Sequence, residues 1–115
     1  MLKENATLAV KNCDESLKID IKGEIDHHSA KKLRENIDSA LFMYRPKLLE
    51  LNLKSVTFMD SSGLGLIVGR LDTAETLGCH VRLENVKRDV MKILKLAGVD
   101  KISRLEIEMA KEQKR

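Results

Sequence analysis

The middle of the chain carries short polar side chains and glycines in one unbroken run, Asp60-Ser61-Ser62-Gly63-Leu64-Gly65. The aspartate and the two serines can each start a helix, because their side-chain oxygens accept hydrogen bonds from first-turn N–H groups. A serine hydroxyl in such a place is open to phosphorylation, and the positive end of the helix dipole favours the added negative charge. General capping preference alone fits a capped turn with no further role equally well.

The run lies between two hydrophobic periods that predict how it is positioned. Residues 48–53 are mostly apolar and predict a buried strand, and helical spacing predicts a helix over about 62–77. The apolar positions of that helix recur at three- and four-residue steps, at Leu64, Ile67, Leu71, Ala74 and Leu77. A strand that runs into a helix N-terminus places the hydroxyls at the C-terminal edge of a sheet, where α/β proteins usually bind ligands.

A nucleophilic enzyme is the first alternative. Ser61 or Ser62 would be the nucleophile, and His27 or His28 would be the base, oriented by Asp26. The chain lacks the Gly-x-Ser-x-Gly elbow of hydrolases, and it has no Gly-Lys-Ser or Gly-Lys-Thr phosphate loop. The two histidines are adjacent, so their side chains are expected to point apart, which disfavours a metal site. We therefore predict no enzymatic activity, no metal and no cofactor.

Composition limits the classes of partner. The 115 residues suffice for one domain, with 43% apolar residues for a core that must be aliphatic, since only 3% are aromatic. Few aromatic rings argue against base stacking on single-stranded nucleic acid. The net charge of +3 comes from interleaved acids and bases, and the dense basic cluster is limited to the tail, at Lys111, Lys114 and Arg115. We predict no nucleic-acid partner.

Cysteine use and hydropathy bear on location. Cys13 and Cys79 match no metal or redox spacing, and two lone thiols suggest a reducing compartment. The N-terminus has no apolar run of signal-peptide length, and no stretch approaches the roughly 20 apolar residues of a membrane helix. We expect a cytoplasmic protein that does not contact membranes.

Two strands and a helix are predicted in the first half of the chain. Strands are expected at 7–10 and 17–22, the second with one buried face, and Gly23 is expected to end it. Asp26 is expected to cap a helix that stops before Pro46. The buried face of this helix is predicted at Ala30, Leu33, Ile37, Leu41 and Tyr44.

The second half continues the alternation of strands and helices. The strand at 48–53 has apolar residues at nearly every other position and partly in between, as expected when both faces of a sheet are covered. A strand is predicted at 79–83, a helix capped by Asn85, and a last short strand within 99–105. The charged tail 106–115 is expected to be a short helix or frayed. The apolar face of the helix after Asn85 is predicted at Val90, Met91, Leu94 and Ala97.

The order of elements predicts an α/β fold. About five strands should form a mixed sheet, parallel in its centre, with the first strand antiparallel at one side and with three to four helices. The whole chain, 1–115, should be one domain with its core at about 8–105. The core is predicted from Leu17, Ile19, Ile21, Leu33, Ile37, Leu49, Leu51, Leu53, Ile67, Leu71, Val81 and Leu94.

Two glycines lie inside the predicted helix at 62–77. Gly65 and Gly69 each weaken it by about 1 kcal/mol relative to alanine. That penalty suggests that something packs close to this helix face. The sheet and a binding partner are equally good candidates.

The chain also resembles a known family. Residues 58–65, Phe-Met-Asp-Ser-Ser-Gly-Leu-Gly, look like the signature of the STAS domain, the family of anti-sigma-factor antagonists and sulfate-transporter tails. Residues 23–28, Gly-Glu-Ile-Asp-His-His, match a second piece, and the order of elements agrees over about 8–105. Within the family the chain is most similar to single-domain, sporulation-type antagonists. It departs from them at its end, where many members carry a longer, more apolar last helix.

The resemblance implies a binding switch. Unphosphorylated antagonists bind an anti-sigma factor that is also a serine kinase, and so free a sigma factor. The kinase phosphorylates the serine that directly follows the aspartate, here Ser61, and the antagonist is released until a serine phosphatase resets it. Asp26 matches the family aspartate next to that serine. The implied partner-binding residues are Asp26, Asp60, Ser61, Ser62, Gly63, Leu64 and Gly65.

Two other functions remain as alternatives. The chain would be a STAS subunit of a different complex, such as a stress-signalling assembly or a lipid-transport system, or a small nucleotide-binding protein.

Overall fold

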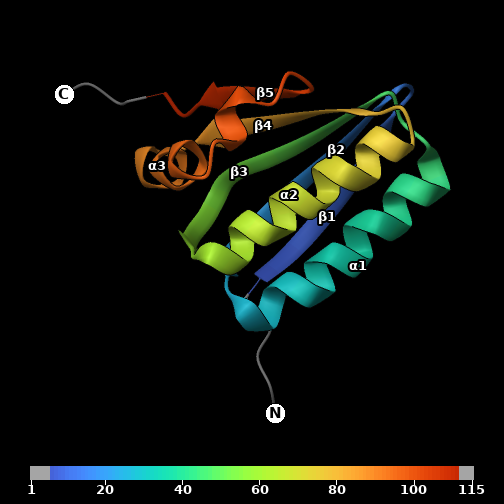
Figure 1. The fold of residues 1–115 in the computed structure, drawn as a ribbon. Helices are drawn as coiled ribbons and strands as arrows, with labels where there is room; N and C mark the ends of the chain where they lie inside the picture. Colours follow the sequence, from blue (N-terminus) through green and yellow to red (C-terminus); the bar gives the residue numbers. More distant parts are fainter. Residues whose placement is uncertain (1–5, 112–115) are drawn as a thin grey trace, which may run out of the picture.

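The computed structural model describes residues 6–111. Five strands form one sheet that is packed against three α-helices and one 3-10 turn (Figure 1). The elements are β1 (Ala6–Cys13), β2 (Ser16–Ile25), α1 (His27–Tyr44), β3 (Leu48–Met59), α2 (Ser61–Thr76), β4 (His80–Val86), α3 (Arg88–Leu96), η1 (Val99–Lys101) and β5 (Leu105–Met109). Within the described range, no helix has the length and apolar character that a membrane crossing requires.

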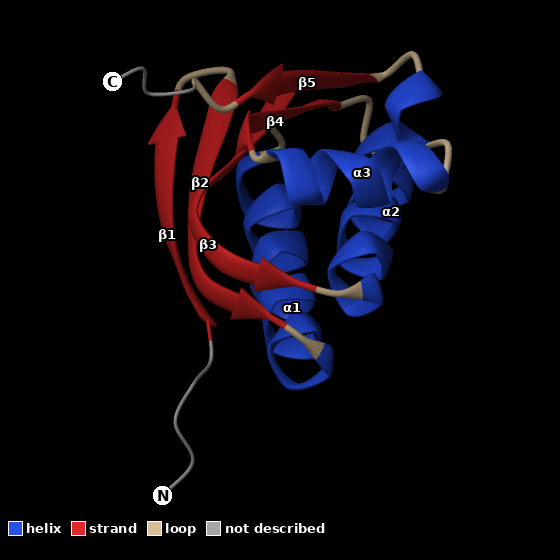
Figure 2. Ribbon diagram, turned by 90° about the vertical axis from the view of Figure 1, so that its left-hand side faces the viewer, coloured by secondary structure: helices blue, strands red, loops and turns tan. Residues whose placement is uncertain are grey.

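The sheet has the strand order β1-β2-β3-β4-β5, with β1 antiparallel to β2 and all other neighbours parallel. This confirms the predicted mixed sheet. Each helical crossover connects a strand to its next neighbour in the sheet, and all of them advance across the sheet in the same direction, from β2 to β5. Because such crossovers are nearly always right-handed, successive helices fall on the same face of the sheet (Figure 2).

The expectation that both faces of β3 are covered is wrong. The face away from the helices is polar, and its residues shield one another. Glu50 is only 5% exposed although no helix covers it, because Arg82 of β4 lies against it with Nη1 3.2 Å from Oε2. The Nε of Arg82 also lies 2.9 Å from Oε2 of Glu106 on β5. These charged cross-strand pairs join three parallel strands on the open face.

The helix-covered face holds an aliphatic core that includes every residue predicted for it. Fully burying a leucine or isoleucine contributes about 1.5–3 kcal/mol, so this face supplies most of the driving force for folding. One ion pair lies within the helical layer, where Nε of Arg70 in α2 is 2.7 Å from Oδ1 of Asp38 in α1. Burial lowers the pKa of Arg70, and the nearby Asp38 carboxylate opposes that shift.

The two central strands are longer than predicted. Gly23 does not end β2, which continues to Ile25; its φ of 109° is open to glycine and lets the strand change direction. β3 continues to Met59, and its pairing with β2 shifts register twice. Such bulges bend a strand. The bent ends of β2 and β3 are visible where they approach α1 and α2 (Figure 2).

Two local predictions are also wrong. Asn85 does not cap α3; it lies in β4 with φ 57° and donates from Nδ2 to Oδ1 of Asn52 at 2.8 Å. The N-cap position of α3 is Lys87, which makes no side-chain capping bond. Tyr44 is 42% exposed instead of buried, because α1 ends there, before Arg45 in the left-handed region.

The end of the chain differs as well. Residues 99–101 form η1, and the last strand is β5 at Leu105–Met109, later than expected. Part of the predicted charged tail is therefore the edge strand of the sheet. Residues 106–111 contain no helix. Residues 112–115, with Lys114 and Arg115, lie outside the described residues.

Glu84 generates a prediction about stability and pH. Burial, and then hydrogen bonding and repulsion with Glu50, raise the pKa of Glu84. A raised carboxyl pKa means that the folded state holds the proton more tightly, so this contribution to stability is present at low pH and lost as pH rises through the folded pKa. Glu84→Gln should therefore stabilise the protein at about pH 7, by up to roughly 0.5 kcal/mol, and lose the advantage near pH 4.

Urea denaturation at both pH values measures this difference. Glu106→Gln is the matched control. Glu106 accepts a hydrogen bond from the charged Arg82 side chain, so removing the charge of Glu106 should not stabilise the fold. Equal effects of the two substitutions at about pH 7 would contradict the assignment.

Candidate functional site

The ends of β2 and β3 lie side by side and start two neighbouring helices. Ile25 and Met59 are register partners at these ends, and the amide of Asp60 donates to the carbonyl of Ile25 at 3.3 Å. Asp26 is the N-cap of α1 and Asp60 is the N-cap of α2. Two carboxylates and two helix N-termini therefore meet at one edge of the sheet.

Asp26 is committed to its own helix. Its Oδ1 accepts from the amides of His28 and Ser29, both at 3.0 Å. The Oγ of Ser29 in turn accepts from the amide of Asp26 at 3.0 Å and donates to the carbonyl of Glu24 at 2.8 Å. Sequence reasoning identified Asp26 as a cap but missed Ser29. The three-residue spacing of a capping box was the available signal.

The two serines of the run differ in exposure. Asp60 accepts from the amide of Ser62 at 2.8 Å, so α2 begins at Ser61, one residue earlier than predicted. Ser61 is exposed, whereas Ser62 is half-buried. Among residues 6–111 no side chain or carbonyl hydrogen-bonds the hydroxyl of Ser61. The hydroxyl of Ser61 is thus open to a reacting partner.

The glycines that follow have two different roles. A Cβ on Gly63 would overlap the Cγ of Met59 and would lie 2.7 Å from its Sδ and 3.2 Å from Cγ2 of Ile25. Glycine is needed there for the first turn of α2 to rest on the strand ends. A Cβ on Gly65 or Gly69 would meet no atom within 4 Å. The idea that the sheet packs closely on these two glycines is therefore wrong.

The outward face of α2 runs from the serine along the helix. Gly65 is exposed, and Leu64, Val68 and Gly69 are half-buried, so this face combines small residues with partly exposed apolar ones. Every predicted site residue lies at one of the two cap positions or within the first five residues of α2.

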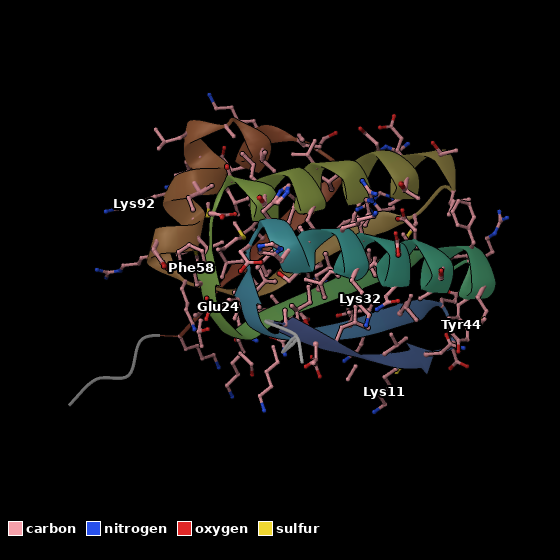
Figure 3. The ribbon with its side chains drawn as sticks, turned by 90° about the horizontal axis from the view of Figure 1, so that it is seen from below. Lys11, Glu24, Lys32, Tyr44, Phe58 and Lys92 are labelled. Carbon is pink, nitrogen blue, oxygen red and sulfur yellow. The ribbon has the colours of Figure 1, made fainter. Side chains whose placement is uncertain are left out.

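Phe58 was not predicted as a site residue. It is 48% exposed and is the register partner of Glu24, at the end of the molecule where the capping aspartates lie (Figure 3). An aromatic residue directly before the polar run was the available signal.

The histidines do not assemble a nucleophile and base. His27 and His28 are exposed at the start of α1, with ring centroids 6.0 Å apart in an edge-to-face arrangement. Neither ring hydrogen-bonds Ser61 or Ser62 within the described part of the chain. Over the same residues, no three His, Cys, Asp or Glu side chains gather in a way that would hold a metal ion.

Comparison with known proteins decides the family. Residues 7–112 match the STAS domain. The chain belongs to the STAS domain family. The sequence resemblance is thus confirmed over nearly the whole described fold.

Similar STAS proteins have regulatory names. The chain is 33% identical over 85 residues to an anti-sigma F factor antagonist of Lysinibacillus sphaericus, covering 74% of this chain and 73% of the relative. It is 32% identical over 98 residues to an anti-sigma-B factor antagonist of Bacillus subtilis, covering 85% and 88%. These are names of regulatory binding proteins, not of enzymes.

Solved structures of the anti-sigma factor antagonist SpoIIAA of Bacillus share the fold. Its unphosphorylated form matches with a TM-score of 0.74 at 27% identity, covering 88% of this chain and 87% of SpoIIAA. Its phosphorylated form matches with a TM-score of 0.69 at 26% identity, covering 88% and 90%. This STAS chain therefore shares its architecture with a protein whose unphosphorylated and phosphorylated forms are both known.

The glycines of the STAS signature generate a stability prediction. Gly63→Ala should destabilise the fold by about 1–3 kcal/mol, since the added methyl overpacks against Met59 and Ile25. Gly65→Ala is the matched control in the same helix and should stabilise it by up to about 1 kcal/mol, because its Cβ meets nothing. Urea denaturation of both variants is the measurement. A Gly63→Ala protein as stable as Gly65→Ala would refute the close packing.

Proposed function

We propose that this STAS protein is an anti-sigma-factor antagonist switched by phosphorylation of Ser61. Unphosphorylated, it binds an anti-sigma factor that has serine kinase activity. Phosphorylation releases it, and a serine phosphatase restores the binding form. In this proposal residues 1–115 act as a single domain in the cytoplasm, without cofactor, and the protein is a substrate and not an enzyme.

The observation that carries the proposal is the exposed Ser61 hydroxyl at the first residue of α2. It directly follows the capping Asp60, as the family motif requires of the modified serine, and it is more exposed than Ser62. A kinase must bring this hydroxyl in line with a phosphoryl donor, so an exposed hydroxyl at a rigid helix start suits the reaction.

The geometry supports release by added charge. A phosphate adds about −1.5 to −2 charges. The first-turn donors are already engaged, because the amide of Ser62 donates to Oδ1 of Asp60 and the amides of Gly63 and Leu64 donate to its carbonyl at 3.0 and 3.4 Å. The phosphate charge would therefore add to the negative charge of Asp26 and Asp60, because the N–H groups of the first turn that could bind it already have acceptors. A hundredfold loss of affinity takes about 2.8 kcal/mol, which one desolvated phosphate can supply.

The outward face of α2 supports a partner surface that continues from Ser61. Gly65 and Gly69 weaken the helix, and no neighbouring atom of the protein lies close enough to require a glycine at either position. Small residues on an exposed helix face allow another backbone to approach closely. We assign this face, with Asp26 and Leu64 at its margins, to the anti-sigma factor.

The second candidate function is that of an antagonist that acts on a different anti-sigma factor. The relative in Bacillus subtilis is named for the anti-sigma-B factor, and its identity is close to that of the anti-sigma F relative. An antagonist of a different anti-sigma factor therefore fits equally well. No observation in residues 6–111 specifically favours lipid transport or nucleotide binding.

Phosphorylation at one serine is the first test of the proposal. The anti-sigma factor kinase of the source organism, with ATP, should add one phosphate at Ser61, read by mass spectrometry of tryptic peptides. Ser61→Ala should fold and should co-purify with the kinase even with ATP, because no charge can be added. Ser61→Asp should bind poorly but better than the phosphorylated protein, since it carries one charge instead of nearly two.

Ser62→Ala is the matched control and should remain phosphorylatable, because the capping oxygen belongs to Asp60. Phosphate on Ser62, or modification of Ser61→Ala, would show that the switch is assigned to the wrong hydroxyl. Co-purification that is equal with and without ATP would refute the switch itself.

Binding across α2 gives a second test. Gly65→Leu should weaken partner binding by at least about tenfold, or roughly 1.4 kcal/mol, because the side chain would stand on the exposed face. It should leave folding intact, since the site is open to solvent. Isothermal titration gives the affinity and thermal melting gives the stability. A variant that binds normally would exclude Gly65 from the interface.

A further inference from the structure

The net positive charge of the chain is concentrated in one segment, and not in the tail 106–115 as expected, because three acidic residues balance the three basic ones there. Residues 87–104 contain six Lys or Arg and two Asp, a net charge of +4, whereas the whole chain carries +3. The rest of the chain therefore has a net charge of −1. This segment comprises α3, η1 and the loop that leads to β5.

The core determines which side of α3 faces solvent. Val90 and Leu94 are buried, and Val99 of η1 is buried beside them. Lys92 and Lys95 are consequently exposed, and their three-residue spacing places them on neighbouring positions of the helix surface. Lys92 extends away from the molecule at the same end as Phe58 and Glu24 (Figure 3).

These cations lack internal partners. Within residues 6–111, the side chains of Lys92, Lys95, Lys101 and Arg104 are exposed and enter no ion pair or hydrogen bond. Arg70 and Arg82 are, by contrast, paired with carboxylates of neighbouring elements. We call Lys92, Lys95, Lys101 and Arg104 the basic patch.

An apolar side chain lies within the same segment. Leu96 is 90% exposed, directly after Lys95, and contributes almost nothing to the core of the protein. Interfaces commonly combine such an apolar contact with a charged rim. The segment has no aromatic ring to stack on a base, which disfavours single-stranded nucleic acid as the partner.

The basic patch adjoins the proposed switch surface. α2 contacts both α1 and α3, so it lies in the middle of the helical layer (Figure 1). A partner that covers the outward face of α2 therefore extends onto α1 or α3. Of these two neighbours, α3 belongs to the segment with the larger net charge, +4 over residues 87–104 against +1 over residues 27–44 of α1.

We propose that the basic patch docks an acidic surface of the same anti-sigma factor that binds Ser61 and α2. This inference rests on the proposed function and adds the chemistry of the partner: carboxylates beside the kinase site, with an apolar contact for Leu96. Complementary charge at the rim of an interface acts mainly on the rate of association. Leu96 acts on the rate of dissociation.

Charge reversal tests the patch. Lys92→Glu/Lys95→Glu should slow association with the purified anti-sigma factor by about tenfold or more at low salt. In about 1 M salt, where the Debye length is roughly 3 Å, the association rate of this double variant should approach that of the unmodified protein. Lys11→Glu/Lys22→Glu is the matched control, with the same change in net charge on exposed residues of β1 and β2, and should change the rate little. Leu96→Ala should raise the dissociation rate without altering the melting temperature.

The outcomes separate this inference from the proposed function. One outcome is that the unmodified chain binds the anti-sigma factor and is released by ATP while both double variants associate at the same rate. That result would overturn the docking proposal for the basic patch and leave the proposed Ser61 switch intact. If the unmodified chain does not bind the anti-sigma factor, both are overturned. Binding of vesicles with anionic lipid that is lost only in Lys92→Glu/Lys95→Glu, with unchanged partner association, would assign the patch to a membrane surface and overturn the docking proposal.

Discussion

The site depends on one close contact between the first turn of α2 and the ends of the central strands. Gly63 faces Met59 and Ile25 with no room for a Cβ, and these two residues are register partners. The contact therefore holds two strands and a helix together at one point. Because the helix start cannot rise from the sheet, Asp60 stays in its capping position and Ser61 faces solvent. Packing in the core thus decides which hydroxyl is exposed.

A sheet with helices on one face divides the molecule into two surfaces. Crossovers that advance in one direction put α1, α2 and α3 together, so the outward face of α2 is part of a broad helical surface. The opposite face is a set of charged strands, in which Glu50, Arg82 and Glu106 satisfy one another. Charge added at the start of α2 is therefore separated from the charge pairs that join the strands. In the proposed switch, phosphorylation and structural charge pairing therefore use different residues.

The sequence by itself determined the class of fold, the core and the place of the polar run. Alternating and helical hydrophobic periods are local signals, and they correctly predicted the order of elements and the mixed sheet. Both capping aspartates, Asp26 and Asp60, were among the predicted helix starters, because a short side-chain oxygen suits a cap in almost any context. The low aromatic content predicted an aliphatic core, and Phe42, Tyr44 and Phe58 are all exposed.

Only the tertiary structure decided how these elements meet. The lengths of β2 and β3, with their bulges and the left-handed angle at Gly23, depend on pairing between segments about 30 residues apart. The same holds for Asn85, whose side chain bonds across strands to Asn52 instead of capping α3. The exposure of Ser61 over Ser62 also follows from which faces the core buries. Local periodicity carries no information on such contacts, because they join residues distant in the chain.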